Sequence, residues 1–364
     1  MSRILIITSD TGGPAAAAVG VGAELARRGH DVRVLGHVAQ YRAVHDAGLS
    51  FAARSAALDP ARALPERQFA AARVALAVDP RSALDVRAEL TRRRPDVVVV
   101  DATELAALRE AERSGLPVVV LAATLPGYLT RTWARGPIGL ATTLRRLRPG
   151  KLWGAAARVL VATDPQLDPD AGTLPTNAVH TGAVVGPTRP PAREPDPFVA
   201  VSLSTGYQPA QADTLQRILD ALGTLDVTAA VSVGDGVDAG PLRAPGNAVL
   251  HRYVDHDDVL ARAHLLIGHG GHATTVRALA NDLPVLVLPL HPLFEHAAVG
   301  AAVAQAGAGR VLGADAPAEA IAHAVRALLG DGRHHGAAAG IGARLRARDG
   351  AAAAADEIER LHPS

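Results

Sequence analysis

The residues with the clearest chemistry form a turn near position 270. The apolar run 265–267 ends at a glycine, His269-Gly270-Gly271 follows, and Thr274 comes three residues later. An apolar strand that ends in glycines lets the backbone turn sharply and approach a ligand closely. The helix expected after the glycines begins with unpaired N–H groups, and its macrodipole favours a negative charge there. The pattern therefore predicts an anion site for phosphate, with the ring of His269 as a further donor.

The elements that position this turn are a strand, a helix and a second strand. Residues 276–280 continue as a helix, and the apolar run 283–290 is typical of a buried parallel strand. The start of the chain has the same order, with strands expected at 3–8 and 31–35 and a helix over about 15–28. Two such units predict parallel, doubly wound sheets that bind ligands at the carboxyl ends of their strands.

The turn and the residues after it resemble the donor signature of family 1 glycosyltransferases. The resemblance covers His269-Gly270-Gly271-x-x-Thr274, the helix, the strand ending at Pro289 and the acidic residue beyond it. It is greatest to the bacterial natural-product branch, which glycosylates polyketides, macrolides and related antibiotics. Residues 198–206 resemble the first strand and loop of the family's nucleotide domain, and residues 251–256 occupy the place where the family clamps the base. The resemblance is good over 197–315 and weaker but continuous over 1–185.

This resemblance implies an α/β protein of the GT-B fold. In that fold two doubly wound Rossmann-like domains face a cleft, and a C-terminal helix packs back on the first domain. We assign residues 1–186 to an acceptor-binding domain and 198–340 to a nucleotide-sugar-binding domain. Residues 187–197 are rich in proline and are expected to form the linker. Residues 341–364 are expected to form the helix that crosses back.

The resemblance also implies a donor site that needs no metal and no cofactor besides the nucleotide diphosphate sugar. The residues expected to bind this donor are Ser204, Thr205, His269, Gly270, Gly271 and Thr274 at the diphosphate, Tyr253 and Val254 at the base, and Glu295 and His296 at the sugar. Each has an ordinary alternative. The glycines can form a plain strand-to-helix turn, Tyr253 can be a surface aromatic, and Glu295 and His296 can be solvated loop residues.

Three positions depart from the family's pattern. Arg277 stands where the family has a glutamate that holds the ribose hydroxyls, and an arginine cannot accept hydrogen bonds from a diol. We expect Arg277 to meet a phosphate or to face solvent. Glu295-His296 replaces an Asp-Gln pair, and Pro14 replaces the usual catalytic histidine of the first loop.

Two carboxylates are the candidates for the missing base. Asp101 lies at the tip of the strand that begins after Pro95 and matches the family's aspartate partner, while Asp10 lies near the top of the first strand. Alternatively, the acceptor is acidic enough to need little help, as a phenol is. The structural alternative is that Asp101 caps the next helix and Asp10 closes a turn.

Composition excludes several other classes of protein. The chain has 364 residues, a formal charge of +1 and 3% aromatic residues, so nucleic acid is not an expected partner. Without cysteine it has no disulfide, catalytic thiolate or Cys-ligated zinc. His269, His272, His291 and His296 lack ligand spacing, so no metal site is expected. No apolar run is long enough to span a membrane and no signal peptide is apparent, so we expect a cytoplasmic protein.

The sequence thus predicts transfer of a sugar from a TDP- or UDP-sugar to a hydrophobic small-molecule acceptor, with inversion at the anomeric carbon. Two alternatives remain open. One is a catalytically impaired homologue that acts as an auxiliary or binding protein, and the other is a nucleotide-sugar epimerase or hydrolase on the same fold. The sequence also leaves a homodimer open.

Overall fold

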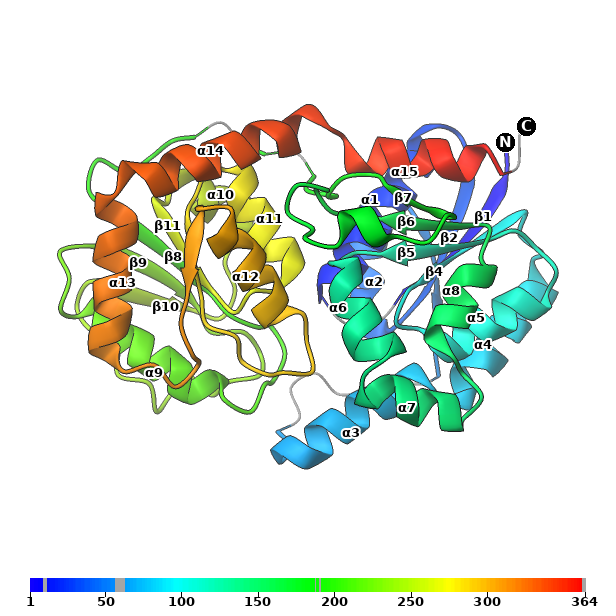
Figure 1. Cartoon of the computed structure of the whole chain (residues 1–364), viewed down its shortest axis with the longest axis horizontal. Coiled ribbons are helices and arrows are strands. Elements are labelled where there is room, and N and C mark those ends of the chain that lie inside the picture. Colours follow the sequence, from blue (N-terminus) through cyan, green and yellow to red (C-terminus); the bar gives the residue numbers. More distant parts are fainter. Residues whose placement is uncertain (9–11, 56–62, 187, 190, 362–364) are drawn as a thin grey trace. The chain divides into compact units, whose positions relative to one another are not determined.

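A computed structural model describes residues 1–8, 12–55, 63–186, 188–189 and 191–361, which fall into two compact units (Figure 1). The first unit comprises 1–58, 70–184 and 348–364, and the second comprises 59–69 and 185–347. These boundaries differ from the expected ones in two places. The chain returns to the first unit at Arg348 instead of residue 341, and a short segment ending at Phe69 belongs to the second unit.

The described part of the first unit is built on a parallel sheet with the strand order β3-β2-β1-β4-β5-β6-β7. Its strands are β1 (Arg3–Ile7), β2 (Asp31–Gly36), β3 (Ser50–Ala53), β4 (Val97–Asp101), β5 (Val118–Ala122), β6 (Arg158–Val161) and β7 (Ala178–His180). Its helices include α1 (Gly12–Arg27), α2 (Tyr41–Asp46), α4 (Pro80–Arg92) and α5 (Leu105–Arg113), while α3 (Glu66–Ala77) begins in the second unit. The central strands β4 and β5 are buried along their whole length, as parallel strands covered on both faces are.

Short helices follow one another in the first unit after β5. They are α6 (Pro126–Tyr128), the π-helix η2 (Leu129–Ala134), α7 (Pro137–Leu144) and α8 (Pro149–Ala155). A proline stands at the start of α6, α7 and α8. Proline is favourable at a first helical position because the N–H it lacks has no partner there. Prolines that resemble loop markers in the sequence therefore begin helices.

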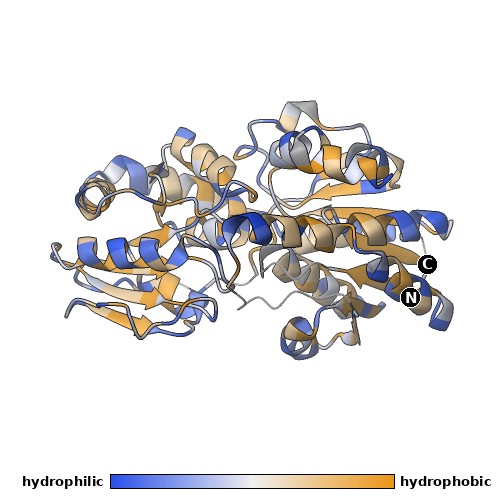
Figure 2. Ribbon diagram, turned by 90° about the horizontal axis from the view of Figure 1, so that it is seen from below, coloured by the Kyte–Doolittle hydropathy of each residue, from blue (hydrophilic) through white to orange (hydrophobic). Residues whose placement is uncertain are grey.

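The second unit has a parallel sheet with the order β10-β9-β8-β11-β12-β13. Its strands are β8 (Phe198–Ser202), β9 (Thr228–Ser232), β10 (Ala248–His251), β11 (Leu265–Gly268), β12 (Val285–Val287) and β13 (Gly309–Val311). Its helices are α9 (Gln211–Leu222), α10 (His256–Arg262), α11 (His272–Ala280), α12 (His296–Gln305), α13 (Ala318–Gly330) and α14 (Gly332–Ala347). Figure 2 shows the hydrophobic strands of each sheet enclosed by helices whose outer faces are hydrophilic.

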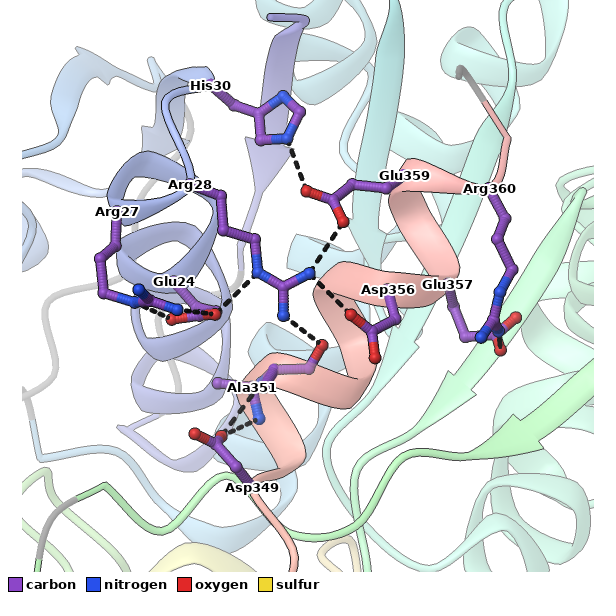
Figure 3. A network of polar contacts seen from close by, with 11 residues as sticks. Glu24, Arg27, Arg28, His30, Asp349, Ala351, Asp356, Glu357, Glu359 and Arg360 are labelled. Atoms are coloured by element: carbon purple, nitrogen blue, oxygen red, sulfur yellow. Dashed lines mark hydrogen bonds and ion pairs between the residues drawn. The ribbon is translucent and has the colours of Figure 1, made fainter. Parts of the chain in front are cut away.

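The last helix of the chain packs on the first unit, as the resemblance implied. The C-terminal region forms two helices, α14 and α15, where a single helix was expected. Helix α14 stays with the second unit, where Arg346 pairs with Asp282, and Asp349 caps α15 (Gly350–Glu359) through the amides of residues 351 and 352. Figure 3 shows how α15 is held against α1: Arg28 Nη1 donates to Asp356 (2.7 Å) and to Glu359 (2.8 Å). Apolar residues of both helices share one core cluster beneath these ion pairs.

Candidate donor-binding site

The predicted anion turn lies between β11 and α11, and its backbone requires glycine at two positions. Gly270 has φ +87°, and a Cβ there would lie 2.5 Å from the carbonyl oxygen of His296. A Cβ on Gly271 would lie 2.6 Å from the ring nitrogen Nε2 of His269. Gly271 is the N-cap of α11, so the first amides of that helix face the turn without a side-chain cap. The expected strand, glycine turn and helix are therefore present, with Thr274 in the first turn of the helix.

A carboxylate already lies at this helix N-terminus. Glu295 Oε1 accepts a hydrogen bond from the His272 amide at 3.4 Å. Burial raises the pKa of Glu295, while its backbone hydrogen bonds act in the opposite direction. The contact shows that the turn accommodates an oxyanion, as the helix macrodipole favours. It also brings Glu295 and His296, remote in sequence from the turn, against it.

The ring of His269 is neutral in this environment. Burial lowers the pKa of His269 to about 4, although a hydrogen bond with the Ser202 backbone partly offsets the effect. Its Nδ1 has no hydrogen-bond partner among the described residues, and its ring meets that of His296 edge-on at 4.4 Å between centroids. A neutral imidazole has a single N–H, and the hydrogen bond with the Ser202 backbone uses it, so Nδ1 offers a lone pair that can accept from a sugar hydroxyl. Donation from His269 to a phosphate stays a prediction.

Ser204 and Thr205 lie at the same edge of the sheet as the turn. Strands β8 and β11 are parallel neighbours with Ser202 opposite Gly268, so the loops that follow them start side by side. The backbone of the loop after β8 is fixed by a hydrogen bond, in which the Thr205 carbonyl accepts from the Asp235 amide at 2.9 Å. These contacts fix the backbone and leave the hydroxyl of Thr205, an exposed residue, available to a ligand.

The expected base-binding segment follows β10. Tyr253 is 71% exposed and contacts the His256 ring edge-on at 6.5 Å, while Val254 is buried. His256 Nε2 lies 2.9 Å from the Ser202 hydroxyl, which ties the segment to the end of β8. An exposed Tyr253 beside the donor edge suits stacking on a base but equally suits a surface aromatic, so its role stays a prediction.

Arg277 has a partner that the sequence did not indicate. Its Nε donates to Asp257 Oδ1 at 2.9 Å and its Nη2 donates to the same oxygen, while the expected contact with a phosphate stays a prediction. Asp257 lies in the first turn of α10. The two side chains are partly buried, so the pair joins α10 to α11 through a charge-assisted hydrogen bond.

Asp101 ends β4 in the first unit, and its carboxylate is used by the following turn. Oδ1 accepts from the backbone amide of Thr103 at 2.8 Å and from its hydroxyl at 2.6 Å. The structural alternative for Asp101 was a cap of the next helix, but the N-cap of α5 is Glu104, and Asp101 instead forms a turn with Thr103. Asp10 lies outside the described residues. Whether either carboxylate acts as the base stays a prediction.

Sequence reasoning missed a polar cluster at the carboxyl edge of the first sheet. Arg54 follows β3, and its fully buried guanidinium donates to Glu104 (2.6 Å), to the Thr8 carbonyl (3.2 Å) and to Ser82. His37 follows β2, is 1% exposed, and neither ring nitrogen has a hydrogen-bond partner among the described residues. Burial, aided by the Arg54 charge, lowers the pKa of His37 to about 4. The sequence signal for the cluster was weak, because its members are far apart in the chain.

Within the described residues, no three His, Asp or Glu side chains converge as metal ligands do, and no helix is long and apolar enough to cross a membrane.

No protein-family model matches the sequence. Among curated proteins, demethyllactenocin mycarosyltransferase of Streptomyces fradiae is 30% identical over 45% of this chain, a match that covers only 36% of that protein. Zeaxanthin glucosyltransferase of Pseudescherichia vulneris is 26% identical, and the match covers 92% of each chain.

Solved structures share the fold over nearly the whole chain. The glycotransferase of kitacinnamycin superposes with a TM-score of 0.81 at 23% identity, covering 100% of this chain and 99% of that one. Spinosyn rhamnosyltransferase SpnG, in a structure complexed with thymidine diphosphate, superposes with a TM-score of 0.75 at 22% identity and covers 98% and 100%.

Two Rossmann-like units with parallel sheets and a C-terminal helix packed on the first define a GT-B protein. The chain is thus similar in sequence to curated glycosyltransferases and shares the fold of solved ones.

Proposed function

We propose that this protein transfers a sugar from a TDP- or UDP-sugar to a hydrophobic natural-product acceptor, without a metal and with inversion at the anomeric carbon. The observation that carries the proposal is the turn at Gly270 and Gly271, where the first turn of α11, the His269 ring and the Glu295 carboxyl group meet. The relatives support the donor class, because one solved relative binds thymidine diphosphate. They support the acceptor class through names such as zeaxanthin glucosyltransferase.

The reaction needs charge stabilisation at the departing diphosphate. The acceptor oxygen attacks the anomeric carbon as the bond from that carbon to the diphosphate oxygen breaks, and negative charge grows on the leaving group. The backbone amides in the first turn of α11 are oriented donors for that charge. Donors that are already oriented stabilise the transition state without reorganising, which is the largest effect available here.

The acceptor hydroxyl must also lose its proton. Pro14 cannot take it, so we assign this role to a carboxylate, with Asp101 and Asp10 as the candidates. Asp101 already accepts two hydrogen bonds from Thr103 on one oxygen, which fix the orientation of its carboxyl group. An acidic acceptor such as a phenol would need less help from a base.

Calorimetric titration with TDP and UDP, with and without EDTA, tests the donor site. We expect one of them to bind with a micromolar Kd that EDTA does not change, and His269→Ala to weaken binding at least tenfold. His323→Ala, an exposed histidine on α13 of the same unit, is the matched control and should bind as the wild type does. Equal affinities of both variants would contradict the phosphate assignment.

The rival is a non-catalytic auxiliary protein, which the departures at Pro14 and Arg277 favour. Failure of the wild type to bind either nucleotide would support this rival. Nucleotide binding followed by hydrolysis of the donor, with no transfer to any acceptor in a hydrophobic panel, would instead support a hydrolase.

A further inference from the structure

A row of aromatic rings runs from the anion turn to the segment before α3. Within the second unit the rings of Tyr207, Phe69, His291, Phe294, His296 and His269 are in successive contact. The ring centroids are between 4.4 and 6.1 Å apart along this row. The Tyr207 hydroxyl donates to the Leu64 carbonyl at 3.3 Å, which fixes the segment that carries Phe69. In a chain with four phenylalanines and four tyrosines, such a concentration beside a ligand turn indicates a binding wall.

His291 is the residue of this row whose chemistry is incomplete. It is 6% exposed, and burial lowers the pKa of His291, so the ring is neutral near pH 7. Its Nδ1 accepts a hydrogen bond from the Leu293 amide at 3.0 Å. The single proton of the neutral ring therefore resides on Nε2. That Nε2–H has no acceptor among the described residues.

A buried donor without an acceptor is costly, so an oxygen atom that reaches Nε2 would be bound favourably. Glu66 is the charged group that acts on His291 electrostatically, but it is exposed and is not within hydrogen-bond distance. The rings of Phe69 and Phe294 contact His291 at steep angles and also contact each other. The environment thus combines one fixed donor with two apolar rings.

We propose that His291 Nε2–H donates to an oxygen of the donor's sugar, in a subsite walled by Phe69 and Phe294. A sugar has C–H bonds on its faces and oxygen atoms around its edge. The C–H faces suit the apolar rings, and an edge oxygen suits the Nε2–H donor. The His291 ring is not itself in contact with that of His269, because the rings of Phe294 and His296 come between them in the series of ring contacts. We therefore assign its Nε2–H to the sugar and let the comparison with the free nucleotide test this choice. His291 is thus a specificity residue for the sugar. The inference rests on the proposed function, because it requires a nucleotide-sugar donor.

The test compares a nucleotide with and without its sugar. We expect His291→Phe, which keeps an aromatic ring but loses the donor, to weaken binding of TDP-glucose or TDP-rhamnose about tenfold while leaving TDP binding unchanged. His291→Gln keeps an N–H donor and should recover part of the loss. His323→Phe makes the same change at an exposed site and should alter neither affinity.

Three results separate the possible failures. If the wild type binds neither TDP nor UDP, the proposed function itself fails; if it binds only UDP, the same comparison is made with UDP and UDP-glucose. If His291→Phe weakens TDP and both TDP-sugars equally, or weakens none of them, the assignment of His291 to the sugar is overturned although the donor site stands. The third result is that Glu66→Gln weakens TDP-sugar binding as much as His291→Phe does, with unchanged unfolding temperatures. Glu66 would then be the residue that recognises the sugar, and the proposal would also be overturned.

Discussion

Removal of Glu104 should destabilise the first unit more than removal of both partners of its ion pair. Glu104 is the carboxylate bonded directly to the guanidinium of Arg54, and both side chains are buried. The substitution Glu104→Leu leaves the Arg54 charge in a region of low polarity. Its remaining hydrogen bonds, to the Thr8 carbonyl and to Ser82, do not neutralise that charge.

The size of the effect follows from the burial of the pair. Breaking a buried ion pair by removing one partner costs about 3–5 kcal/mol, because an uncompensated charge stays inside the protein. The double variant Arg54→Met with Glu104→Leu removes both charges, and its main loss is the two hydrogen bonds from Arg54, each worth about 1 kcal/mol. For domains of this size 1 kcal/mol lowers the melting temperature by about 2–4 °C, so Glu104→Leu should melt about 6–20 °C lower.

Differential scanning calorimetry checks this order. We expect two transitions or a broadened one, with the first unit's component lowered by Glu104→Leu and partly restored in the double variant. A double variant less stable than Glu104→Leu, or a single variant within about 1 kcal/mol of the wild type, would refute the reasoning that an unpaired buried charge dominates.

Two further outcomes follow from the same structure. Because the pKa of His37 is lowered to about 4 from 6.5, the unfolded chain binds a proton between these values that the folded protein does not, so stability falls as the pH falls through this window. At pH 5 the loss of unfolding free energy that is due to His37 is on the order of 2 kcal/mol, from 1.5 pH units at about 1.36 kcal/mol each. The melting temperature of His37→Phe should therefore fall less between pH 7 and pH 5 than that of the wild type. Identical pH profiles would contradict this. Gly270→Ala should weaken TDP binding at least tenfold, because a residue with a Cβ is strained at φ +87° and this Cβ would meet the His296 carbonyl. The control Gly330→Ala should leave TDP binding unchanged, because a Cβ at Gly330 would have no atom within 4 Å. Equal titrations of the two variants would count against the turn as the phosphate site.

The sequence alone determined the fold class and the glycine turn. Both depend on local patterns: alternating apolar runs and helices predict parallel sheets, and glycines after a strand predict the turn that Gly270 forms. A C-terminal helix on the first unit was also foreseeable, but the return at Arg348 was not, because it depends on which unit α14 packs against.

Tertiary structure alone decided the partners of individual side chains. Arg277 was expected at a phosphate or in solvent, but a carboxylate twenty residues earlier pairs with it. Arg54 and Glu104 are fifty residues apart, and neither belongs to a recognisable pattern. Phe69 meets His291 although most of the first unit lies between them in the chain. Local periodicity reports which face of an element is buried, whereas these contacts depend on how separate elements pack, which no short stretch of sequence specifies.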